Sequence, residues 1–259
     1  MSLQPAVNIH TLRHKHGHSW STERIRWHTA QAAVRAAQRL RYKVFAQELG
    51  ARLHSSINEV DQDQFDEHCH HLLVRDNTSG DIVGYTRILD RTAAAHAGGF
   101  YSQTEFDIAP LLRLPGGLAE IGRTCVHPAY RNGSTIAILW SAIAEFIAEY
   151  QINYLFGCAS LPLAQPFAYG AVQASAQNLQ KRFAAPAEWQ VRPLLPLPKV
   201  ASSEKTRAAP LPPLLKAYLR LGAKICGPPC LDPDFQVADF CVVLATNGLD
   251  FRYARHFLT

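Results

Sequence analysis

The stretch EIGRTCVHPAYRNGSTIAILWSAIAEF (Glu120–Phe146) decides the fold. Its alternating apolar segment ends at Val126-His127-Pro128, a polar turn follows, and a helical pattern begins at Ser134. A strand that enters a helix through such a turn aims several backbone N–H groups and the positive helix end at one point, which suits a phosphate. Gly133 lets the backbone come close, and Arg131 adds a charged hydrogen-bond donor. An ordinary strand–helix loop explains the turn equally well, so other segments must decide.

Outward from this stretch, hydrophobic spacing predicts an α/β protein. Residues 29–50 carry apolar side chains at helical spacing and stop at Gly50, and the apolar runs 70–76 and 81–90 flank a turn-rich tetrapeptide, which is a hairpin signature. The other expected elements are a short helix at 105–112, strands at 118–126 and 154–159, helices at 134–150, 164–183 and 214–221, and strands at 223–226 and 235–245.

The same pass along the chain suggests one large domain with a connector. Residues 1–27 form a histidine-bearing leader, and residues 28–183 form the core. Prolines recur through residues 184–213, which predicts a linker with little regular structure. Residues 214–259 are expected to complete the same domain, because the apolar strand near their middle can join a sheet.

Composition excludes several classes of protein. The 259 residues are 47% hydrophobic and 18% charged, and no apolar run approaches the roughly 18 residues of a membrane span, so a globular, cytoplasmic protein is expected. The net charge of +5 fits an acidic partner or a peripheral contact with an anionic inner-membrane surface. The basic residues are dispersed without an arginine-rich or aromatic nucleic-acid motif, so no nucleic-acid partner is expected.

Cysteine and histidine spacing gives no metal site. The six cysteines are irregularly spaced, and Cys226 and Cys230 lack a second ligand pair, so we expect free buried thiols. His68, His70 and His71 cluster at the start of a strand, where neighbouring side chains diverge. Cys125 is expected to be a packing residue, because no histidine or aspartate is spaced to activate it.

The order of elements resembles the GNAT acyltransferase fold: helix, hairpin, strand ending in Val-x-Pro, polar turn, helix, strand. The resemblance implies a mixed central sheet flanked by helices, with the pantetheine of the acyl donor in a cleft between two splayed strands and its phosphate on the turn. The donor-binding residues would then be Val126, Arg131, Asn132, Gly133 and Ser134.

The turn departs from the usual pattern of that family, because Ser134 and Ile136 stand where small glycines belong. An acyl carrier protein presents pantetheine on a single phosphodiester and asks fewer N–H groups of the loop than the pyrophosphate of coenzyme A. The departure therefore favours the acyl-phosphopantetheine of acyl carrier protein as donor, and no permanently bound cofactor is expected.

Five blocks in register are similar to the acyl-homoserine-lactone (autoinducer) synthases: 41–45, 61–66, 84–87, Phe106 and 120–123. The tail, residues 211–244, instead resembles ornithine N-acyltransferases of ornithine-lipid synthesis. The resemblance implies transfer of a (3-hydroxy) fatty acyl chain from acyl carrier protein to the α-amine of ornithine, giving lyso-ornithine lipid. An autoinducer synthase and a non-catalytic carrier-protein-binding module stay open as alternatives, as do lysine, glutamine and glycine as acceptors.

Acyl transfer to an amine needs a group that takes the amine proton and donors for the developing oxyanion. Glu120 is the expected general base or amine-orienting group, together with Asp63 and Arg123 at the catalytic site. Glu120 and Arg123 are three apart on a strand, so they point to opposite faces unless a bulge intervenes. Arg123 is expected to serve as framework or to contact the substrate carboxylate.

The acidic residues of 61–66 suit a cationic amino acid, and crowded carboxylates raise one another's pKa. A solvated acidic loop is the alternative explanation for the same pattern. Arginines before and after this loop would form a frame that neutralises it, and an ordinary surface salt bridge is the alternative for each of them. The expected substrate-binding residues are Asp61, Asp66, Arg41, Phe45, Arg87 and Phe106.

Overall fold

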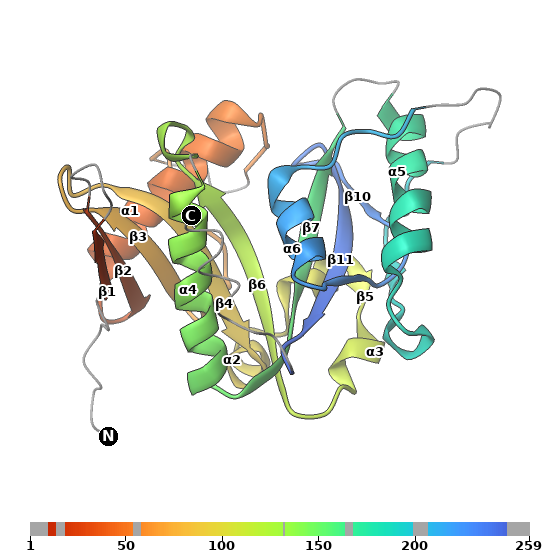
Figure 1. The fold of residues 1–259 in the computed structure, drawn as a ribbon, viewed down its shortest axis with the longest axis horizontal. Helices are drawn as coiled ribbons and strands as arrows, with labels where there is room; N and C mark the ends of the chain where they lie inside the picture. The colour runs from red at the N-terminus through yellow and green to blue at the C-terminus, as the bar shows by residue number, and fades with distance from the viewer. Residues whose placement is uncertain are drawn as a thin grey trace. The chain divides into compact units, whose positions relative to one another are not determined.

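The computed structural model describes residues 10–13, 19–53, 58–131, 133–163, 168–198 and 207–247. These residues form two compact units (Figure 1). The first comprises the described residues up to Gly98 together with Ile121–Ile152, and the second comprises Gly99–Glu120 and the described residues from Asn153 onward.

The sheet of the first unit has the strand order β1-β2-β3-β4-β6. These strands are β1 (His10–Arg13), β2 (Ser19–Arg26), β3 (His70–Asp76), β4 (Ile82–Asp90) and β6 (Gly117–Val126), of which the first four pair antiparallel in sequence order. The hairpin predicted at 70–90 and the strand predicted at 118–126 are confirmed. The interpretation of residues 19–26 as leader is wrong, because β2 pairs along its length with β3 and buries Trp20 and Ile25.

Two helices cover opposite faces of this sheet, α1 (Gln31–Tyr42) and α4 (Ser134–Glu149) (Figure 1). Alternate side chains of β3 show the division. The ring of His70 lies 4.8 Å from that of Phe146 in α4, whereas His71 lies against Tyr85, whose ring also faces Arg41 in α1. The helix predicted at 134–150 is confirmed. A short helix, α2 (Arg91–His96), follows β4, and the 3-10 turn η3 (Pro128–Tyr130) precedes α4.

The helix predicted at 29–50 is confirmed, but its last part is a π-helix, η1 (Lys43–Glu48). The amide of Leu49 donates to the carbonyl of Val44, five residues back, at 3.1 Å. The segment stops at Gly50, whose φ of 75° belongs to the left-handed region that glycine adopts without strain. π-helical turns inside helices are frequent at functional sites. The periodicity of the sequence does not predict this one.

The second unit has the strand order β6-β7-β11-β10, with β9 paired to β11. Its strands are β7 (Ile152–Pro162), β9 (Lys224–Ile225), β10 (Cys230–Asp232) and β11 (Val237–Ala245), and a separate small sheet joins β5 (Phe106–Asp107) to β8 (Arg192–Pro193). Its helices are α3 (Ala109–Leu112), α5 (Ala168–Phe183) and α6 (Pro213–Arg220), with 3-10 turns η2 (Tyr101–Thr104) and η4 (Ala187–Trp189).

Most elements predicted for the second unit are confirmed, including β7, α5, α6, β9 and β11. Residues 164–167 of the predicted helix 164–183 lie outside the described residues. The helix expected at 105–112 is wrong in its first half, where β5 stands. Pro110 explains the difference, since proline fits only the first turn of a helix and therefore restricts α3 to Ala109–Leu112.

The predicted connector 184–213 contains the short elements η4 and β8, and residues 199–206 of it lie outside the described residues. None of the helices in the described part of the chain is both long enough and apolar enough to cross a membrane.

Candidate functional site

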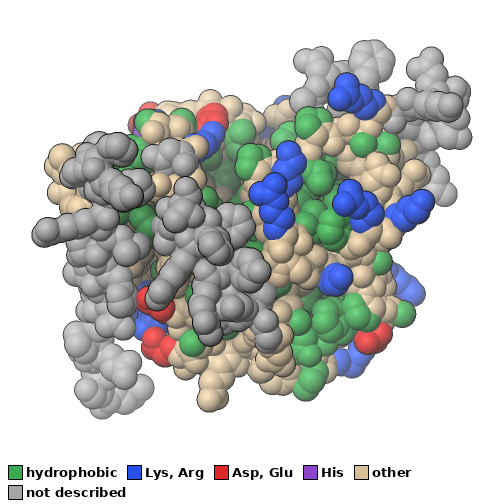
Figure 2. Space-filling model, in the orientation of Figure 1, with side chains coloured by type: hydrophobic (Ala, Val, Ile, Leu, Met, Phe, Trp, Pro, Cys, Tyr) green, Lys and Arg blue, Asp and Glu red, His purple; other side chains and the backbone are tan. Residues whose placement is uncertain are grey.

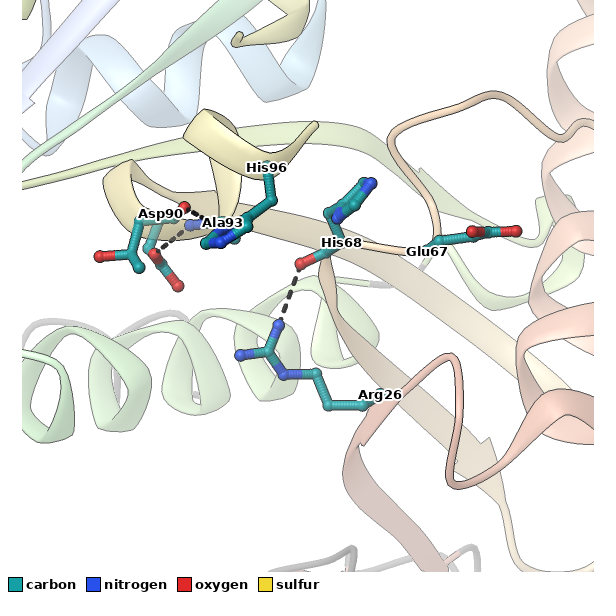
Figure 3. Close-up of a pocket in the computed structure, with 7 residues that line it drawn as sticks. Arg26, Glu67, His68, Asp90, Ala93 and His96 are labelled. Atoms are coloured by element: carbon teal, nitrogen blue, oxygen red, sulfur yellow. Dashed lines mark hydrogen bonds between the residues drawn. The ribbon is translucent and has the colours of Figure 1, made fainter. Parts of the chain in front are cut away.

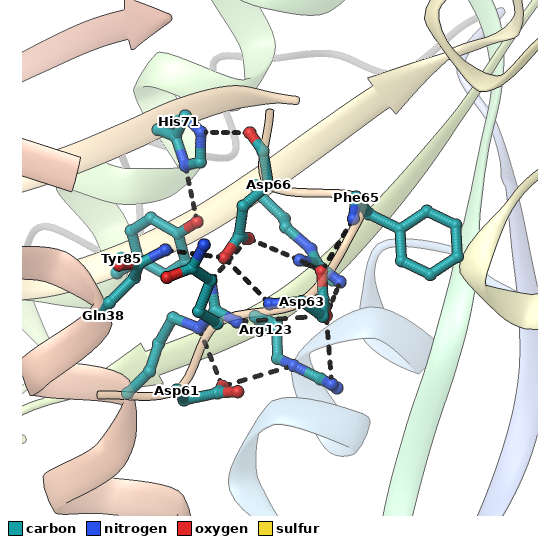
Figure 4. A network of polar contacts seen from close by, with 12 residues as sticks. Gln38, Asp61, Asp63, Phe65, Asp66, His71, Tyr85 and Arg123 are labelled. Atoms are coloured by element: carbon teal, nitrogen blue, oxygen red, sulfur yellow. Dashed lines mark hydrogen bonds and ion pairs between the residues drawn. The ribbon is translucent and has the colours of Figure 1, made fainter. Parts of the chain in front are cut away.

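The acidic loop of the first unit closes a buried ion-pair network (Figure 4). The Nε atom of Arg41 donates to Asp61 at 2.8 Å, and its Nη1 atom donates to Asp66 at 2.7 Å. Arg87 donates to Asp66 and Asp63, both at 2.5 Å. Arg41 and Asp66 have no exposed side-chain surface, so this is a core network and not a solvated loop.

Arg123 joins the same network through a backbone irregularity. Its φ of 54° inside β6 lies in the left-handed region, which a non-glycine residue of a strand rarely adopts. The guanidinium group lies 3.4 Å from Asp61 and 3.3 Å from Asp63. Because this backbone conformation departs from that of a regular strand, the spacing from Glu120 does not decide which way Arg123 points.

The charges of this network balance within the chain. Burial by itself raises the pKa of Asp66, but Arg41 and Arg87 lower it much further, so the net pKa lies well below its usual range. Burial likewise raises the pKa of Asp63, but Arg87 lowers it further, so the net pKa of Asp63 is lowered. Burial would lower the pKa of Arg41, and Asp66 and Asp61 more than reverse this. The carboxylates of Asp63 and Asp66 therefore stay ionised at neutral pH. The role of the acidic residues in substrate binding stays a prediction.

Three further polar residues complete the network and were not predicted from the sequence as site residues. Gln38 donates to Asp66 at 2.8 Å. His71 contacts the backbone carbonyl of Asp66 at 2.9 Å and the hydroxyl of Tyr85 at 2.8 Å. A signal existed for Gln38, which precedes Arg41 by three residues on one helix face. His71 uses both ring nitrogens in these contacts, which leaves neither for a metal.

The buried position of His71 predicts an unusually low pKa. A backbone carbonyl only accepts, so Nε2 carries the proton and Nδ1 accepts from Tyr85. Burial lowers the pKa of His71 from 6.5 to about 4. The stability from this site is present above pH 6.5 and is lost as the pH falls towards 4, because only the unfolded chain binds the proton in that interval. An NMR titration of His71 should give a midpoint near 4. A midpoint near the ordinary histidine value of 6.5 would contradict this buried, neutral form of the ring.

Glu120 lies in the second unit and is fixed by one turn of chain. Its Oε2 atom accepts from the amide of Tyr101 at 2.7 Å, and Oε1 accepts from the amide of Ser102 at 2.7 Å and from the Ser102 hydroxyl. The Ser102 hydroxyl also lies 3.4 Å from the thiol of Cys158 in β7. The carboxylate is 5% exposed and held at both oxygens, so it is positioned as a fixed acceptor.

The two aromatic candidates have packing positions. Phe106 is 1% exposed in β5. Phe45 lies in η1 and packs against the apolar cluster between α1 and the sheet. The structure thus brings together Asp61, Asp63, Asp66, Arg41, Arg87 and Arg123 in the first unit, and it places Glu120 and Phe106 in the second.

The turn before α4 carries the residues expected to bind the donor, and that role stays a prediction. Gly133, with φ of 91°, is the N-cap of α4, and no side chain caps the helix there. Ser134 is the first residue of that helix. Arg131 forms a bidentate pair with Glu48, at 2.5 and 2.7 Å, and donates to the carbonyl of Val126 at 3.1 Å. Asn132 lies outside the described residues.

A polar cavity of about 280 Å³ also opens in the first unit (Figure 3). It is lined by Arg26, Glu67, His68, Asp90, Thr92, Ala93 and His96. Two of its charged groups, those of Asp90 and Arg26, have structural partners. Asp90 accepts from the amide of Ala93 and pairs with His70 at 3.5 Å, and Arg26 donates to the carbonyl of His68. None of the residues proposed from the sequence for catalysis lines it.

The cysteines behave as packing residues in the described part of the chain. Cys125 is buried, and burial raises the pKa of its thiol to about 12, which removes it as a nucleophile at neutral pH.

Among the described residues, one group brings three potential ligand oxygens within 4.8 Å of one another: Glu105, Asp232 and Asp239, all of the second unit.

Comparison with solved structures supports the fold. The acyl-homoserine-lactone synthase LasI superposes with a TM-score of 0.54 at 15% identity, over 95% of each chain. BjaI, a coenzyme A-dependent acyl-homoserine lactone synthase solved with MTA, gives a TM-score of 0.53 at 14% identity, over 90% of this chain and 86% of that one. At these identities the likeness shows a shared fold. The predicted GNAT-like mixed sheet flanked by helices is thereby confirmed.

Sequence relatives carry the assignment further. Residues 40–141 match the acetyltransferase (GNAT) domain family. An L-ornithine N(alpha)-acyltransferase of Brucella abortus is 35% identical over 90% of this chain and 88% of its own length. Enzymes of the same name from Rhizobium meliloti and Agrobacterium fabrum are 36% and 35% identical, over 87% and 86% of this chain and 81% of their own lengths. The chain is a GNAT-domain acyltransferase and belongs to the L-ornithine N(alpha)-acyltransferase family.

Proposed function

We propose that the protein transfers a fatty acyl chain from acyl carrier protein to the α-amine of L-ornithine, giving lyso-ornithine lipid. The observation that carries the proposal is 33–36% identity, over 86–90% of the chain, to four L-ornithine N(alpha)-acyltransferases. A carrier-protein donor places the reaction in the cytoplasm, and a lipid product suits peripheral contact with the inner membrane.

In the proposed mechanism the neutral α-amine attacks the thioester carbonyl. The C–N bond forms, the C–S bond breaks, and the amine proton passes by way of Glu120 to the departing thiolate of the phosphopantetheine. The hydrogen bonds from Tyr101 and Ser102 hold the Glu120 carboxylate still, so that little reorganisation is needed when the proton moves. Arg123 serves as framework beside Asp63 or contacts the carboxylate of the acceptor.

Expression in a bacterial host that lacks ornithine lipids tests the proposed function. Lipid extracts should contain an acylated ornithine when the wild-type chain is expressed and none with an empty vector. Accumulation of an acyl-homoserine lactone without any ornithine conjugate would favour the autoinducer synthase instead.

The first expected result concerns the donor. Glu48 neutralises Arg131 beside the turn and so reduces the positive charge there. The remaining charge suits a single phosphodiester better than a pyrophosphate, which carries more negative charge. We expect acyl carrier protein to exceed the matching acyl coenzyme A in kcat/KM at least about tenfold, equivalent to about 1.4 kcal/mol. Glu48→Gln should narrow that gap, because it should raise kcat/KM for acyl coenzyme A more than kcat/KM for acyl carrier protein. Equal specificity constants in the wild type would remove the argument.

The second expected result concerns docking of the carrier. Lys216 and Arg220 on α6 and Lys224 on β9 are exposed in the second unit, and Figure 2 shows Lys and Arg side chains among apolar ones where α5 and α6 lie. Carrier proteins are acidic, and surface charges act mainly on association. Reversing Lys216 and Arg220 to glutamate should raise the KM for the carrier about 3- to 30-fold and flatten its salt dependence.

The matched control for this experiment lies in the first unit. Arg39 and Arg52 are also exposed, and reversing both changes the net charge by the same amount. This control should leave the KM for the carrier within about twofold, since long-range charge is largely screened at physiological salt. Equal effects of the two double reversals would show that net charge, and not this surface, governs docking.

A further inference from the structure

The second unit contains a group of three carboxylates whose local electrostatics differ from those of the Asp61, Asp63 and Asp66 network. Glu105 follows η2, Asp232 ends β10, and Asp239 lies on β11; one oxygen of each lies within 4.8 Å of the others. Glu105 and Asp239 are buried and Asp232 is partly buried.

The backbone explains why these side chains converge. In the antiparallel pair of β10 and β11, Asp232 lies opposite Val237 and Cys230 lies opposite Asp239, so Asp232 and Asp239 share one face as diagonal neighbours. The Ser160 hydroxyl donates to Asp239 at 2.6 Å, and two backbone amides donate to Asp232 at 2.9 and 3.0 Å. These bonds orient both carboxylates independently of any ligand.

Glu105 is the member whose charge lacks compensation. Only 7% of the Glu105 surface is exposed. No donor among the described residues forms a hydrogen bond of good geometry with either of its carboxylate oxygens. Burial and the Asp239 carboxylate raise the pKa of Glu105 to about 8, against smaller lowering effects of Tyr101 and Cys158. A buried carboxylate without a donor is costly, so the position favours a ligand that brings hydrogen-bond donors and positive charge.

An ammonium group fits these three oxygens. It carries three N–H donors, and N–H···O distances of about 2.8 Å around a tetrahedral nitrogen place the acceptor oxygens about 4.6 Å apart. The three oxygens lie within 4.8 Å of one another, which is compatible with that spacing. The Asp61, Asp63 and Asp66 carboxylates, by contrast, already face three guanidinium groups, so an external ammonium gains less there.

The group also lies next to the proposed base within the same unit. The Cys158 thiol contacts the Ser102 hydroxyl, which donates to Glu120, and the same thiol lies close enough to Glu105 to affect its pKa. In the register of β7 with β11, Cys158 and Ser160 share a face with Asp239 and Cys241. Two side chains, Ser102 and Cys158, therefore separate Glu120 from the acidic group. The acceptor of the proposed reaction likewise has two amino groups joined by a short chain.

We propose that Glu105, Asp232 and Asp239 bind the side-chain ammonium group of the amino-acid acceptor and thereby select basic acceptors over neutral ones. This assignment rests on the proposed function, since it concerns the acceptor of that reaction. It makes these residues specificity determinants, with the α-amine left for Glu120.

The test compares L-ornithine with L-norvaline, which has the same carbon chain without the terminal amine. Calorimetry measures their equilibrium binding without an acyl donor, and steady-state assays measure kcat/KM for each. The wild type should prefer ornithine about 10- to 100-fold in both. Asp239→Asn and Glu105→Gln should reduce the preference to within about threefold, through weaker binding of ornithine and unchanged binding of norvaline.

Two variants serve as controls. Glu188→Gln removes an exposed carboxylate of the same unit and should keep the wild-type preference. Asp63→Asn tests the other acidic group as the rival binding site for the side-chain ammonium. Melting temperatures identify a variant that fails to fold, and Glu105→Gln should not lower the melting temperature at neutral pH, because the raised pKa keeps the buried Glu105 carboxyl largely protonated and glutamine is neutral too.

Several outcomes would overturn the assignment. These are an unchanged ornithine preference in both Asp239→Asn and Glu105→Gln, loss of the preference in Asp63→Asn alone, or Mn²⁺ or Ca²⁺ binding that depends on Asp239 while ornithine binding does not. Absence of ornithine acylation in the wild type would instead count against the proposed function, and the calorimetric comparison would still decide the ammonium site.

Discussion

Asp66→Asn is expected to destabilise the protein by about 3–5 kcal/mol, because it removes one charge from the fully buried pair at the centre of the ion-pair network. Asp66 accepts hydrogen bonds from Arg41, Arg87 and Gln38, and an asparagine amide would turn a donor towards some of them. Such a loss is a large fraction of the stability of an ordinary domain. Urea unfolding followed by circular dichroism measures it.

Two comparisons make this result specific. Asp81→Asn changes an exposed carboxylate in the turn before β4 and should cost less than about 0.5 kcal/mol. The double variant Asp66→Leu with Arg87→Met removes one charge of each sign, leaving Arg41 with Asp61 and Arg123 with Asp63, so it should be more stable than Asp66→Asn. A loss below about 1 kcal/mol in Asp66→Asn would mean that the network behaves like surface salt bridges.

Glu120→Gln is expected to lower kcat by about 10²–10⁴, as for loss of a general base, while binding of the acyl donor stays near the wild-type value. The fall should shrink between about pH 7 and 9.5, where more of the acceptor amine is already neutral. Single-turnover assays with acyl carrier protein and ornithine across this range measure the chemical step.

Ser102→Ala is the matched variant, because it removes the hydroxyl donor to Glu120 and keeps the carboxylate and both backbone amides. We expect it to lower kcat by about tenfold or less, since one neutral hydrogen bond contributes about 1 kcal/mol. Wild-type kcat with a normal pH profile in Glu120→Gln would reduce Glu120 to a structural acceptor for the turn at Tyr101 and Ser102.

The sequence predicted the elements whose pattern is local. Apolar spacing identified the helix that ends at Gly50, the hairpin at 70–90 and the strand–turn–helix around Pro128, since periodicity and turn residues act over a few positions. The blocks shared with acyltransferase families identified Arg41, Asp61, Asp66 and Arg87, which the structure brings into contact.

What the sequence did not predict depends on contacts between distant segments. Arg123 has a positive φ, and arginine is a residue type that gives no sequence signal for one. The partners of Glu120 come from a loop without periodicity, and Glu105 meets Asp239 only because β10 and β11 pair after a proline-rich stretch. The π-helical turn at Lys43–Glu48 preserves a helical pattern in the sequence and shifts only the hydrogen-bond partners.

The most direct measurement is an acyl-transfer assay with the purified protein, a defined 3-hydroxyacyl carrier protein and L-ornithine, with the product examined by tandem mass spectrometry. The account predicts one amide per carrier thiol released, with fragments that place the acyl chain on the α-nitrogen of ornithine and leave the side-chain amine free. An acyl chain on the side-chain nitrogen, or no ornithine amide while S-adenosylmethionine is converted to an acyl-homoserine lactone, would contradict it.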